Sequence, residues 1–321
     1  MDVWVGIDVS METLDFGWYT STGKKHFKVA NTPDGFREAL SKTPLDAKFV
    51  MEATGTYYLN LAFHLDERGH FLSVVNPLCT KSHMRSDLRR AKSDKTDALA
   101  LSRFGQEKNP HRWVAISPEI LQMRQLQCVC DTLRETISAY GNKIHAMEQC
   151  VYSSSYAVGV LEELRSKLEL ELNDVMASLD ELASKAMGRT IEILDSLPGI
   201  GRESAVSLAV LIGDFQRFSN CRKLVSFCGL SPTLSQSGTS VHSKGSISRM
   251  GGHRIRFMLY VCTWSTLRHN EQAKATWKRM KENGKPGKVI IMALVNKMIR
   301  QMYSMVIHDT MYNPNFLAQA A

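Results

Sequence analysis

The first hundred residues alternate between strand and helix patterns in an order that few folds accommodate. Three short strands connected by tight turns come first, at 3–8, 14–19 and 25–29. Thr32 and Pro33 then begin a helix, because threonine caps helices and proline suits the first turn. Two further apolar strands, at 48–52 and 71–75, are separated by helical sequence. Hairpin strands followed by strands joined through helices predict a mixed α/β sheet.

Acidic residues end two of these strands and begin a helix. Asp8 ends the first strand, and Glu52 ends a buried strand, where an unpaired charge costs several kcal/mol. Asp94 and Asp97 are three residues apart at a predicted helix start, so they share one face. Carboxylates in these positions can meet at one sheet edge, and clustered carboxylates are the ligands that pairs of Mg²⁺ or Mn²⁺ ions require. The sequence therefore predicts a divalent-metal site formed by these four acids.

Each acid also has an ordinary structural interpretation. Asp8 could cap the turn that begins at Val9. Asp94 could be a helix N-cap, with Asp97 as the acidic residue three positions later. The residues taken singly leave both interpretations open.

The middle of the chain is helical. Residues 118–150 have a helical pattern, and a serine-rich break at 153–155 precedes a second helix. Apolar residues in that second helix recur with an average spacing of 3.5, at Leu161, Leu164, Leu168, Leu172, Val175, Leu179 and Leu182. This spacing is typical of a coiled coil. We expect the segment to associate with other copies as a dimer or tetramer; the alternative is a helix packed on its own domain.

Positive charge is concentrated in the last third of the chain. The net charge is +8, but residues 241–300 contain thirteen Lys/Arg and two Asp/Glu, a net charge of +11, so the rest of the chain has −3. Two basic helices are predicted at 253–279 and 288–307, after a polar loop at 235–252. A basic segment beside a near-neutral remainder indicates a polyphosphate ligand, and a solvated lysine-rich surface is the alternative. Candidate phosphate contacts are Lys244, Arg249, Arg254 and Arg256.

The segment 197–201, Leu-Pro-Gly-Ile-Gly, lies between two helical patterns. It resembles the hairpin of a helix-hairpin-helix motif. Gly199 and Gly201 would let the backbone approach a phosphate closely, and the next helix would present free N–H groups to it. These two glycines are therefore candidate nucleic-acid contacts.

The cysteines and the hydropathy exclude other classes of protein. The chain has seven cysteines and no CxxC pair, so neither a disulfide framework nor a zinc site is expected. No apolar run approaches the roughly 18 residues of a membrane span, and the first residues lack the basic region of a signal peptide. We expect a cytoplasmic protein that does not contact a membrane.

Four segments of the first half resemble the IS-one-ten family of insertion-sequence transposases, which also contains the Piv pilin-gene invertase. They are residues 6–10 (Gly-Ile-Asp-Val-Ser), 52–57 (Glu-Ala-Thr-Gly-Thr-Tyr), 76–77 (Asn-Pro) and 92–98 (Lys-Ser-Asp-Lys-Thr-Asp-Ala). The resemblance implies an RNase H-like fold of the RuvC type for this half. It also implies an Asp-Glu-Asp-Asp tetrad, at Asp8, Glu52, Asp94 and Asp97.

The second half resembles the transposase domain of the same family at 228–232, 237–238 and 245–248. The resemblance implies that Ser237 is a nucleophile that becomes covalently joined to DNA. It also implies a structured non-coding guide RNA as a partner, beside donor and target DNA. Residues 250–253 depart from the family pattern, in which a basic residue is more common.

These observations predict an α/β domain at 1–150 with an RNase H-like, RuvC-like fold, a coiled-coil connector at 151–190 and a mostly helical transposase domain at 191–321. The predicted function is metal-dependent cleavage and exchange of DNA strands, and three other functions share parts of this pattern. A junction resolvase or nuclease would share the tetrad but needs neither Ser237 nor the large second half. A sugar or acetate kinase would share the Gly-Ile-Asp turn, but its second phosphate loop is not found in the sequence. A non-catalytic nucleic-acid scaffold leaves the four acids unexplained.

Overall fold

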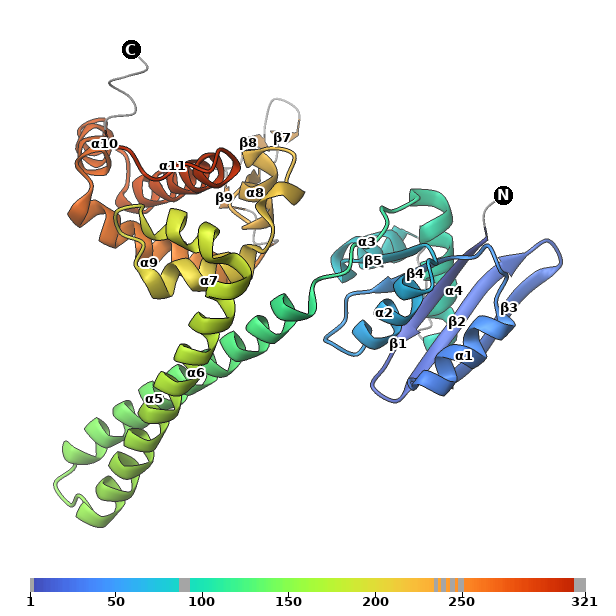
Figure 1. Ribbon diagram of the computed structural model, residues 1–321, viewed down its shortest axis with the longest axis horizontal. Coiled ribbons are helices and arrows are strands. Elements are labelled where there is room, and N and C mark those ends of the chain that lie inside the picture. Colours follow the sequence, from blue (N-terminus) through green and yellow to red (C-terminus); the bar gives the residue numbers. More distant parts are fainter. Residues whose placement is uncertain are drawn as a thin grey trace. The chain divides into compact units, whose positions relative to one another are not determined.

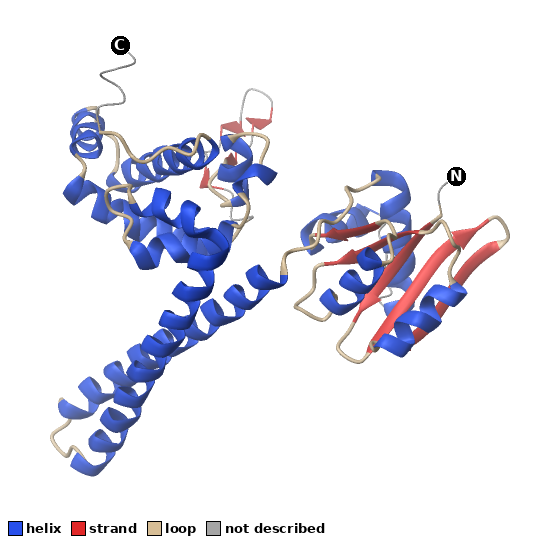
Figure 2. Ribbon diagram, in the orientation of Figure 1, coloured by secondary structure: helices blue, strands red, loops and turns tan. Residues whose placement is uncertain are grey.

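The computed structural model describes residues 3–86, 93–233, 236–237, 241–242, 246–247 and 251–314. By its internal contacts the chain divides into two compact units, Met1–Ile116 and Ser117–Ala321. The first unit holds a five-stranded sheet with helices, and the second is almost entirely helical (Figure 2).

The first unit is built on a mixed sheet whose strand order is β3-β2-β1-β4-β5. Its strands are β1 (Trp4–Val9), β2 (Thr13–Thr20), β3 (Gly23–Ala30), β4 (Lys48–Glu52) and β5 (Leu72–Val75). Its helices are α1 (Pro33–Lys42), α2 (Leu59–Glu67), α3 (Pro77–Ser86) and α4 (Asp94–Lys108). The first three strands are antiparallel, and β4 and β5 run parallel to β1. This arrangement is that of the RNase H-like fold, so the predicted fold class is confirmed.

The strands alternate between two covered faces, as the two-residue period of a strand requires. Helices α1 and α2 pack on one face, and α4 packs on the other (Figure 1). The first face contributes apolar residues that include Val5, Ile7, Phe16, Phe49 and Met51. The second contributes Trp4, Val50 and Val75, which pack with Leu101 and Phe104 of α4. Both faces of the sheet are therefore part of a core.

Two glycines let α4 lie directly on the sheet. Gly6 of β1 and Gly17 of β2 are cross-strand partners. A Cβ atom on Gly6 would lie 2.0 Å from the carbonyl oxygen of Ala98, and one on Gly17 would lie 3.1 Å from the amide nitrogen of Leu99. Any side chain at Gly6 would push the helix away, so this residue fixes how closely α4 approaches the strands.

The second unit consists of helices and a few two-residue strands. The helices are α5 (Pro118–Glu148), α6 (Ser155–Asp195), α7 (Arg202–Ile212), the 3₁₀ helix η1 (Phe215–Arg217), α8 (Cys221–Phe227), α9 (His253–His269), α10 (Glu271–Glu282) and α11 (Gly287–Ile307). One large apolar core includes residues from α6, α7, α8, α9 and α11. The short strands β6 (Pro232–Thr233) and β9 (Ser246–Ile247) pair with each other, as do β7 (Gln236–Ser237) and β8 (Val241–His242). Part of the segment that the sequence predicted as a loop is thus paired.

The apolar seam predicted in the middle of the chain packs inside one chain. Helices α5 and α6 lie side by side as an antiparallel pair (Figure 1). Leu172, Val175, Leu179 and Leu182 pack into the core of the second unit, whereas Leu164 is 41% exposed. The sequence grouped residues 118–150 with the first domain, but in the structure they form α5, which pairs with α6 because both helices bury an apolar face there.

Helix α11 is the one described helix that is long and apolar enough, by length and composition, to cross a membrane. The sequence contains no uninterrupted apolar run of this length here, because Asn296 and Lys297 lie within the helix. Several of its apolar residues, among them Ile290, Val295 and Met302, are buried, whereas Val289 is 50% exposed. The core helix of a globular unit shows the same partial burial.

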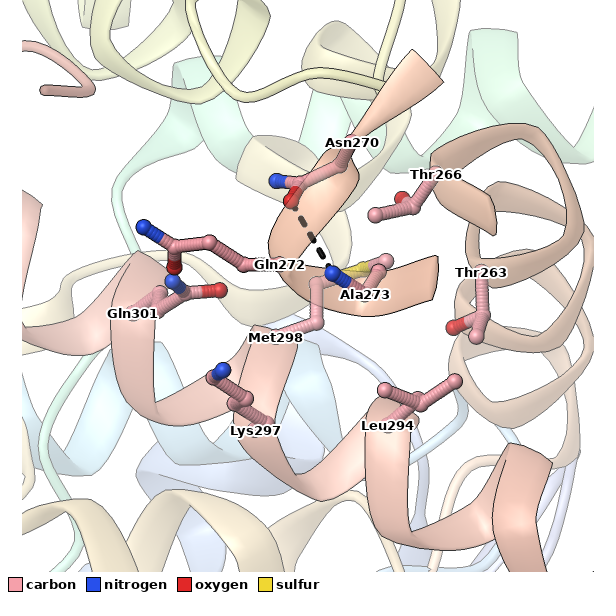
Figure 3. A pocket seen from close by; sticks show the side chains of 9 residues that line it. All are labelled: Thr263, Thr266, Asn270, Gln272, Ala273, Leu294, Lys297, Met298 and Gln301. Carbon is pink, nitrogen blue, oxygen red and sulfur yellow. Dashed lines mark hydrogen bonds between the residues drawn. The ribbon is translucent and has the colours of Figure 1, made fainter. Parts of the chain in front are cut away.

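The prediction of a continuous basic helix at 253–279 is wrong, because Asn270 interrupts it and separates α9 from α10. The side-chain oxygen of Asn270 accepts a hydrogen bond from the amide of Ala273 at 3.1 Å (Figure 3). Asparagine is among the strongest N-cap residues, so it begins a new helix even within a helical pattern. A cavity of about 20 Å³ lies beside this cap, and its volume is far too small for a nucleotide.

The close approach of α4 generates a first prediction. Gly6→Ala should destabilise the first unit by about 3 kcal/mol, because the added methyl group meets backbone atoms that cannot move independently. Gly17→Ala should cost about 1 kcal/mol, since its neighbours need to move only a few tenths of an ångström. Urea unfolding followed by the fluorescence of Trp4 and Trp18 measures both. Equal effects of the two substitutions would contradict the described position of α4.

Candidate active site

Two of the predicted acids lie at the ends of adjacent parallel strands: Asp8 is the last residue but one of β1, and Glu52 is the last residue of β4. In the register of β1 and β4, Ile7 lies opposite Met51, so Asp8 and Glu52 are the next residues along each strand. Both are half-buried. By the alternation of the strands both project to the face that carries α4. The structure therefore brings these two carboxyl groups to one edge of the sheet.

The other two acids lie in the first turn of α4. Ser93 is the N-cap: its hydroxyl accepts a hydrogen bond from the amide of Thr96, whose hydroxyl in turn accepts one from the amide of Ser93. This reciprocal capping box satisfies the helix start. Asp94 and Asp97 are therefore not the capping residues, and the alternative interpretation of this pair as a cap is wrong.

The pKa of Asp8 responds to the other predicted acids. Burial raises this pKa from 3.8 to about 6, with further contributions from the negative charges of Asp97, Asp94, Glu52 and Asp15, in that order. Like charges disfavour ionisation, and so does removal from water. The other three acids predicted from the sequence thus add negative charge around Asp8, and the four are named the acidic group.

Helix α3 supplies a partner for Glu52. The hydroxyl of Thr80, which is fully buried, donates a hydrogen bond of 2.5 Å to Oε1 of Glu52. Asn76 and Pro77 start this helix, and the side-chain oxygen of Asn76 accepts a hydrogen bond from the amide of Leu78. The Asn-Pro pair singled out in the sequence thus begins the helix that fixes one carboxylate of the site.

A fifth carboxylate, which the sequence analysis missed, lies beside Asp8. Asp15 of β2 is the direct cross-strand partner of Asp8 and is 3% exposed. Its carboxylate contacts Nε2 of His26 at 2.7 Å and Nζ of Lys28 at 3.0 Å. Lys28 also donates a hydrogen bond of 3.3 Å to Asp94. One feature of the sequence could have revealed Asp15: it is the single acid in the otherwise apolar strand 14–19, which follows the strand of Asp8.

The donor set suits a divalent cation. Carboxylate oxygens are the ligands that Mg²⁺ and similar ions prefer. The pKa of Asp8 is raised first by burial and then by nearby negative charges, and a cation would relieve the second contribution. Folds of this type with such acids generally use divalent metal ions. Within the described ranges, however, no three His, Cys, Asp or Glu side chains are close enough together to hold one ion.

The candidate nucleophile and the two glycines belong to the second unit. Ser237 ends β7 and pairs with Val241 of β8. Gly199 has a φ of +100°, and a Cβ there would lie 2.3 Å from the hydroxyl of Thr266. Gly199 is therefore required for packing of the hairpin on α9. Gly201 is the exposed N-cap residue of α7.

The two described arginines of the predicted phosphate contacts are both engaged within the second unit. Arg254 forms an ion pair with Asp131 of α5, and burial lowers the pKa of its guanidinium. Arg256 donates hydrogen bonds to the carbonyl oxygens of Gly251, at 2.8 Å, and Cys228, at 3.4 Å. Both join α9 to neighbouring segments. Lys244 and Arg249 lie outside the described residues.

Comparisons with protein families match both halves of the chain. Residues 5–151 match the profile of a family described as transposase, of the DEDD type of IS110 elements. Residues 191–278 match the profile described as transposase IS116/IS110/IS902 family. The two matched segments contain all four acids of the tetrad and Ser237.

Whole-length relatives carry related names. The chain is 28% identical to the pilin gene-inverting protein of Moraxella bovis, over 94% of this chain and 95% of that protein. It is 22% identical to the transposase for insertion sequence element IS1328 of Yersinia enterocolitica, over 96% of this chain and 98% of that protein. A solved structure of T. thermophilus RuvC in complex with a Holliday junction substrate aligns at 13% identity and a TM-score of 0.28, over 35% of this chain and 99% of that one.

The raised pKa of Asp8 generates a second prediction. A carboxyl group whose pKa is higher in the folded state than in the unfolded state destabilises the fold once it is ionised. The metal-free first unit should therefore lose stability as the pH rises from about 4 to about 6. Asp8→Asn removes this loss and should stabilise the metal-free protein at pH 8 by roughly 1–3 kcal/mol, since one pKa unit corresponds to about 1.4 kcal/mol.

Thermal unfolding in EDTA at pH 4.5 and pH 8 measures this effect. Asp66→Asn, at an exposed ion pair with Arg112 of the same unit, is a control that should not gain stability at either pH. If Asp8→Asn destabilised the protein at pH 8, the negative charge at Asp8 would be compensated within the chain, contrary to the clustering described above.

Proposed function

Because the chain belongs to the IS110 family of transposases, with both family domains in order, we propose that it cleaves and exchanges DNA strands with a composite active site. The acidic group around Asp8 supplies the metal-binding part, and Ser237 supplies the nucleophile. A structured non-coding RNA selects the DNA. The reaction takes place in the cytoplasm.

What supports the proposal is the position of four acids toward one end of the sheet. Asp8 lies next to the last residue of β1, Glu52 ends the neighbouring strand β4, and the first turn of α4 adds Asp94 and Asp97. Burial, followed by the negative charges of the other three, raises the pKa of Asp8. A structural cluster of this kind destabilises a fold without a cation, so its presence is best explained by metal binding.

The four acids would hold Mg²⁺ or Mn²⁺. Bound there, the ions would polarise a phosphodiester and lower the pKa of the attacking hydroxyl group. Asp8 and Glu52 stand on rigid strands, so they set the position of the site. The hydrogen bond from Thr80 holds Glu52 in one orientation, which leaves its second oxygen for a ligand.

The bond changes at Ser237 balance without another reactant. The Oγ–P bond forms, the serine proton leaves, and the bond from phosphorus to one deoxyribose oxygen breaks. That oxygen takes up a proton and becomes a free hydroxyl. A serine hydroxyl is a poor nucleophile at neutral pH unless a metal or a base activates it, so Ser237 has to reach the acidic group. We favour a Ser237 supplied by a neighbouring protomer, because DNA cleavage would then occur only after the protomers have assembled.

Two further features support the partners in the proposal. Residues 241–300 have a net charge of +11, which suits nucleic-acid phosphates. Apolar residues remain exposed in this segment: Val151 and Tyr152, in the turn between α5 and α6, are 89% and 93% exposed, and Leu164 and Leu170 of α6 are 41% and 66% exposed. With the 3.5-residue spacing of the seam, they support a dimer or tetramer that associates through these helices.

The metal site generates a third prediction. Glu52→Gln keeps the hydrogen bond from Thr80 and the shape of the side chain but removes a negative charge. Mn²⁺ binding, measured by calorimetry, should weaken at least tenfold, because a hard cation loses a charged oxygen ligand. Strand transfer should fall below detection while nucleic-acid binding, measured by gel shift in EDTA, stays within twofold. Gln substitution at the exposed Glu107, on the same unit, is the matched control.

The nucleophile generates a fourth prediction, tested on a DNA substrate with a nick that traps the cleaved strand. Wild type should give a covalent protein–DNA adduct with phosphoserine at position 237, identified by mass spectrometry, and Ser237→Ala should give none. Ser246→Ala, in the neighbouring ladder, should still form the adduct. An adduct that persists in Ser237→Ala would show that another group attacks the phosphate.

Mixing inactive variants decides which protomer supplies the serine. Ser237→Ala and Asp8→Asn chains, each inactive alone, should recover part of the activity together if Ser237 acts in trans. A stand-alone junction resolvase is the competing function, and it predicts cleavage of a four-way junction by both wild type and Ser237→Ala. Cleavage by the alanine variant would favour that function.

A further inference from the structure

Lys28 contacts both a buried carboxylate, Asp15, and one member of the acidic group, Asp94. On β3 it is the cross-strand partner of Asp15, which is in turn the partner of Asp8. The three residues therefore form a row across three strands on the face that α4 covers. The ammonium group of Lys28 contacts Asp15 at 3.0 Å and Asp94 at 3.3 Å.

Asp15 is the anchor of these contacts, because its side chain is far more buried than those of Lys28 and Asp94. The side chain of Asp15 is 4% exposed, whereas those of Lys28 and Asp94 are 46% and 65% exposed. His26, two residues earlier on β3, contacts the other carboxylate oxygen of Asp15 at 2.7 Å. Both oxygens of Asp15 thus have partners inside the chain, so Asp15 is placed to hold Lys28 rather than to serve as a metal ligand.

Lys28 contacts one of the proposed metal ligands. Carboxylates from three elements contribute to the charge around Asp8, yet in the described part of the chain no three of them are grouped closely enough for one ion. Of the two acids that contact Lys28, Asp94 is the more exposed. Among the described residues, Lys28 therefore pairs with an acid that the metal site would need.

We propose that Lys28 is a resident cation that holds Asp94 in the metal-free chain, and that a divalent ion takes Asp94 over from Lys28 when it binds. Before the ion binds, the ammonium group of Lys28 compensates part of the negative charge, because it contacts both Asp15 and Asp94. Asp15 and His26 are positioning residues, because they keep the ammonium group beside the site. This inference rests on the proposed metal-binding function of the four acids.

The exchange predicts a gain of metal affinity when the resident cation is removed. In the full-length chain without nucleic acid, Lys28→Met should bind Mn²⁺ about fivefold more tightly than wild type, the upper range for the loss of a half-exposed ion pair. Lys28→Arg keeps the charge and a bidentate fork for carboxylates, so its affinity should equal that of wild type or be weaker. Calorimetry with Mn²⁺ at 0.15 M salt measures all three.

Lys25→Met is the matched control on the same strand. Lys25 is three residues from Lys28, about 10 Å along the strand and on the opposite face, where its ammonium group lies over the ring of Trp18. At this ionic strength, charges farther apart than about 8 Å are largely screened. The control should therefore leave Mn²⁺ affinity unchanged.

The outcomes separate the two proposals. If wild type and all variants fail to bind Mn²⁺, the proposed metal function is overturned and the exchange with it. If wild type binds but Lys28→Met binds equally or more weakly, the exchange is overturned and the metal function stands. Tighter binding by Lys28→Arg would overturn the exchange by itself, even if Lys28→Met did not fold. Tighter binding by Lys28→Met alone supports it.

Discussion

The contact of α4 with the β1–β2 hairpin is the constraint on which the first unit depends. Gly6 and Gly17 lie opposite each other and leave no side chain between strand and helix backbone. Because the helix lies this close, its first turn reaches the end of the sheet where Asp8 is. Two acids that are more than eighty residues from Asp8 in the sequence thereby join its electrostatic group. The glycine of the Gly-Ile-Asp motif serves packing, and the aspartate serves chemistry.

The same approach creates an electrostatic penalty that the fold limits locally. Glu52 receives the hydroxyl of the buried Thr80, and Asp15 is paired on both oxygens. Burial and the neighbouring negative charges raise the pKa of Asp8. The end of a strand tolerates such a group because it is only half-buried. A cation beside Asp8 would therefore stabilise the unit.

Residues near each other in sequence could be placed from the sequence, and residues joined by tertiary contacts could not. The strand ends at Asp8 and Glu52 followed from local pattern, and with them the mixed sheet. Asp15 was overlooked because the role of a single acid in an apolar strand cannot be inferred until the residues opposite it on the neighbouring strands are known. Asn270 was read as part of a helix, because capping competes with helix propensity and only the packing decides. The leucine seam predicted self-association, which stays a prediction, and the sequence could not show that its second half packs into the core of its own chain.

The basic segment shows why total charge is a poor measure of a binding surface. Arg254 and Arg256 contribute to the net +11 of residues 241–300, yet one is paired with Asp131 and the other holds two carbonyl oxygens. A phosphate would have to displace these partners, and an arginine that is already paired gains little by the exchange. Charge counts along a sequence therefore overstate the cations available to nucleic acid. Lys28 is likewise paired with carboxylates of its own unit, so a ligand for any of these three cations would first have to displace a partner within the chain.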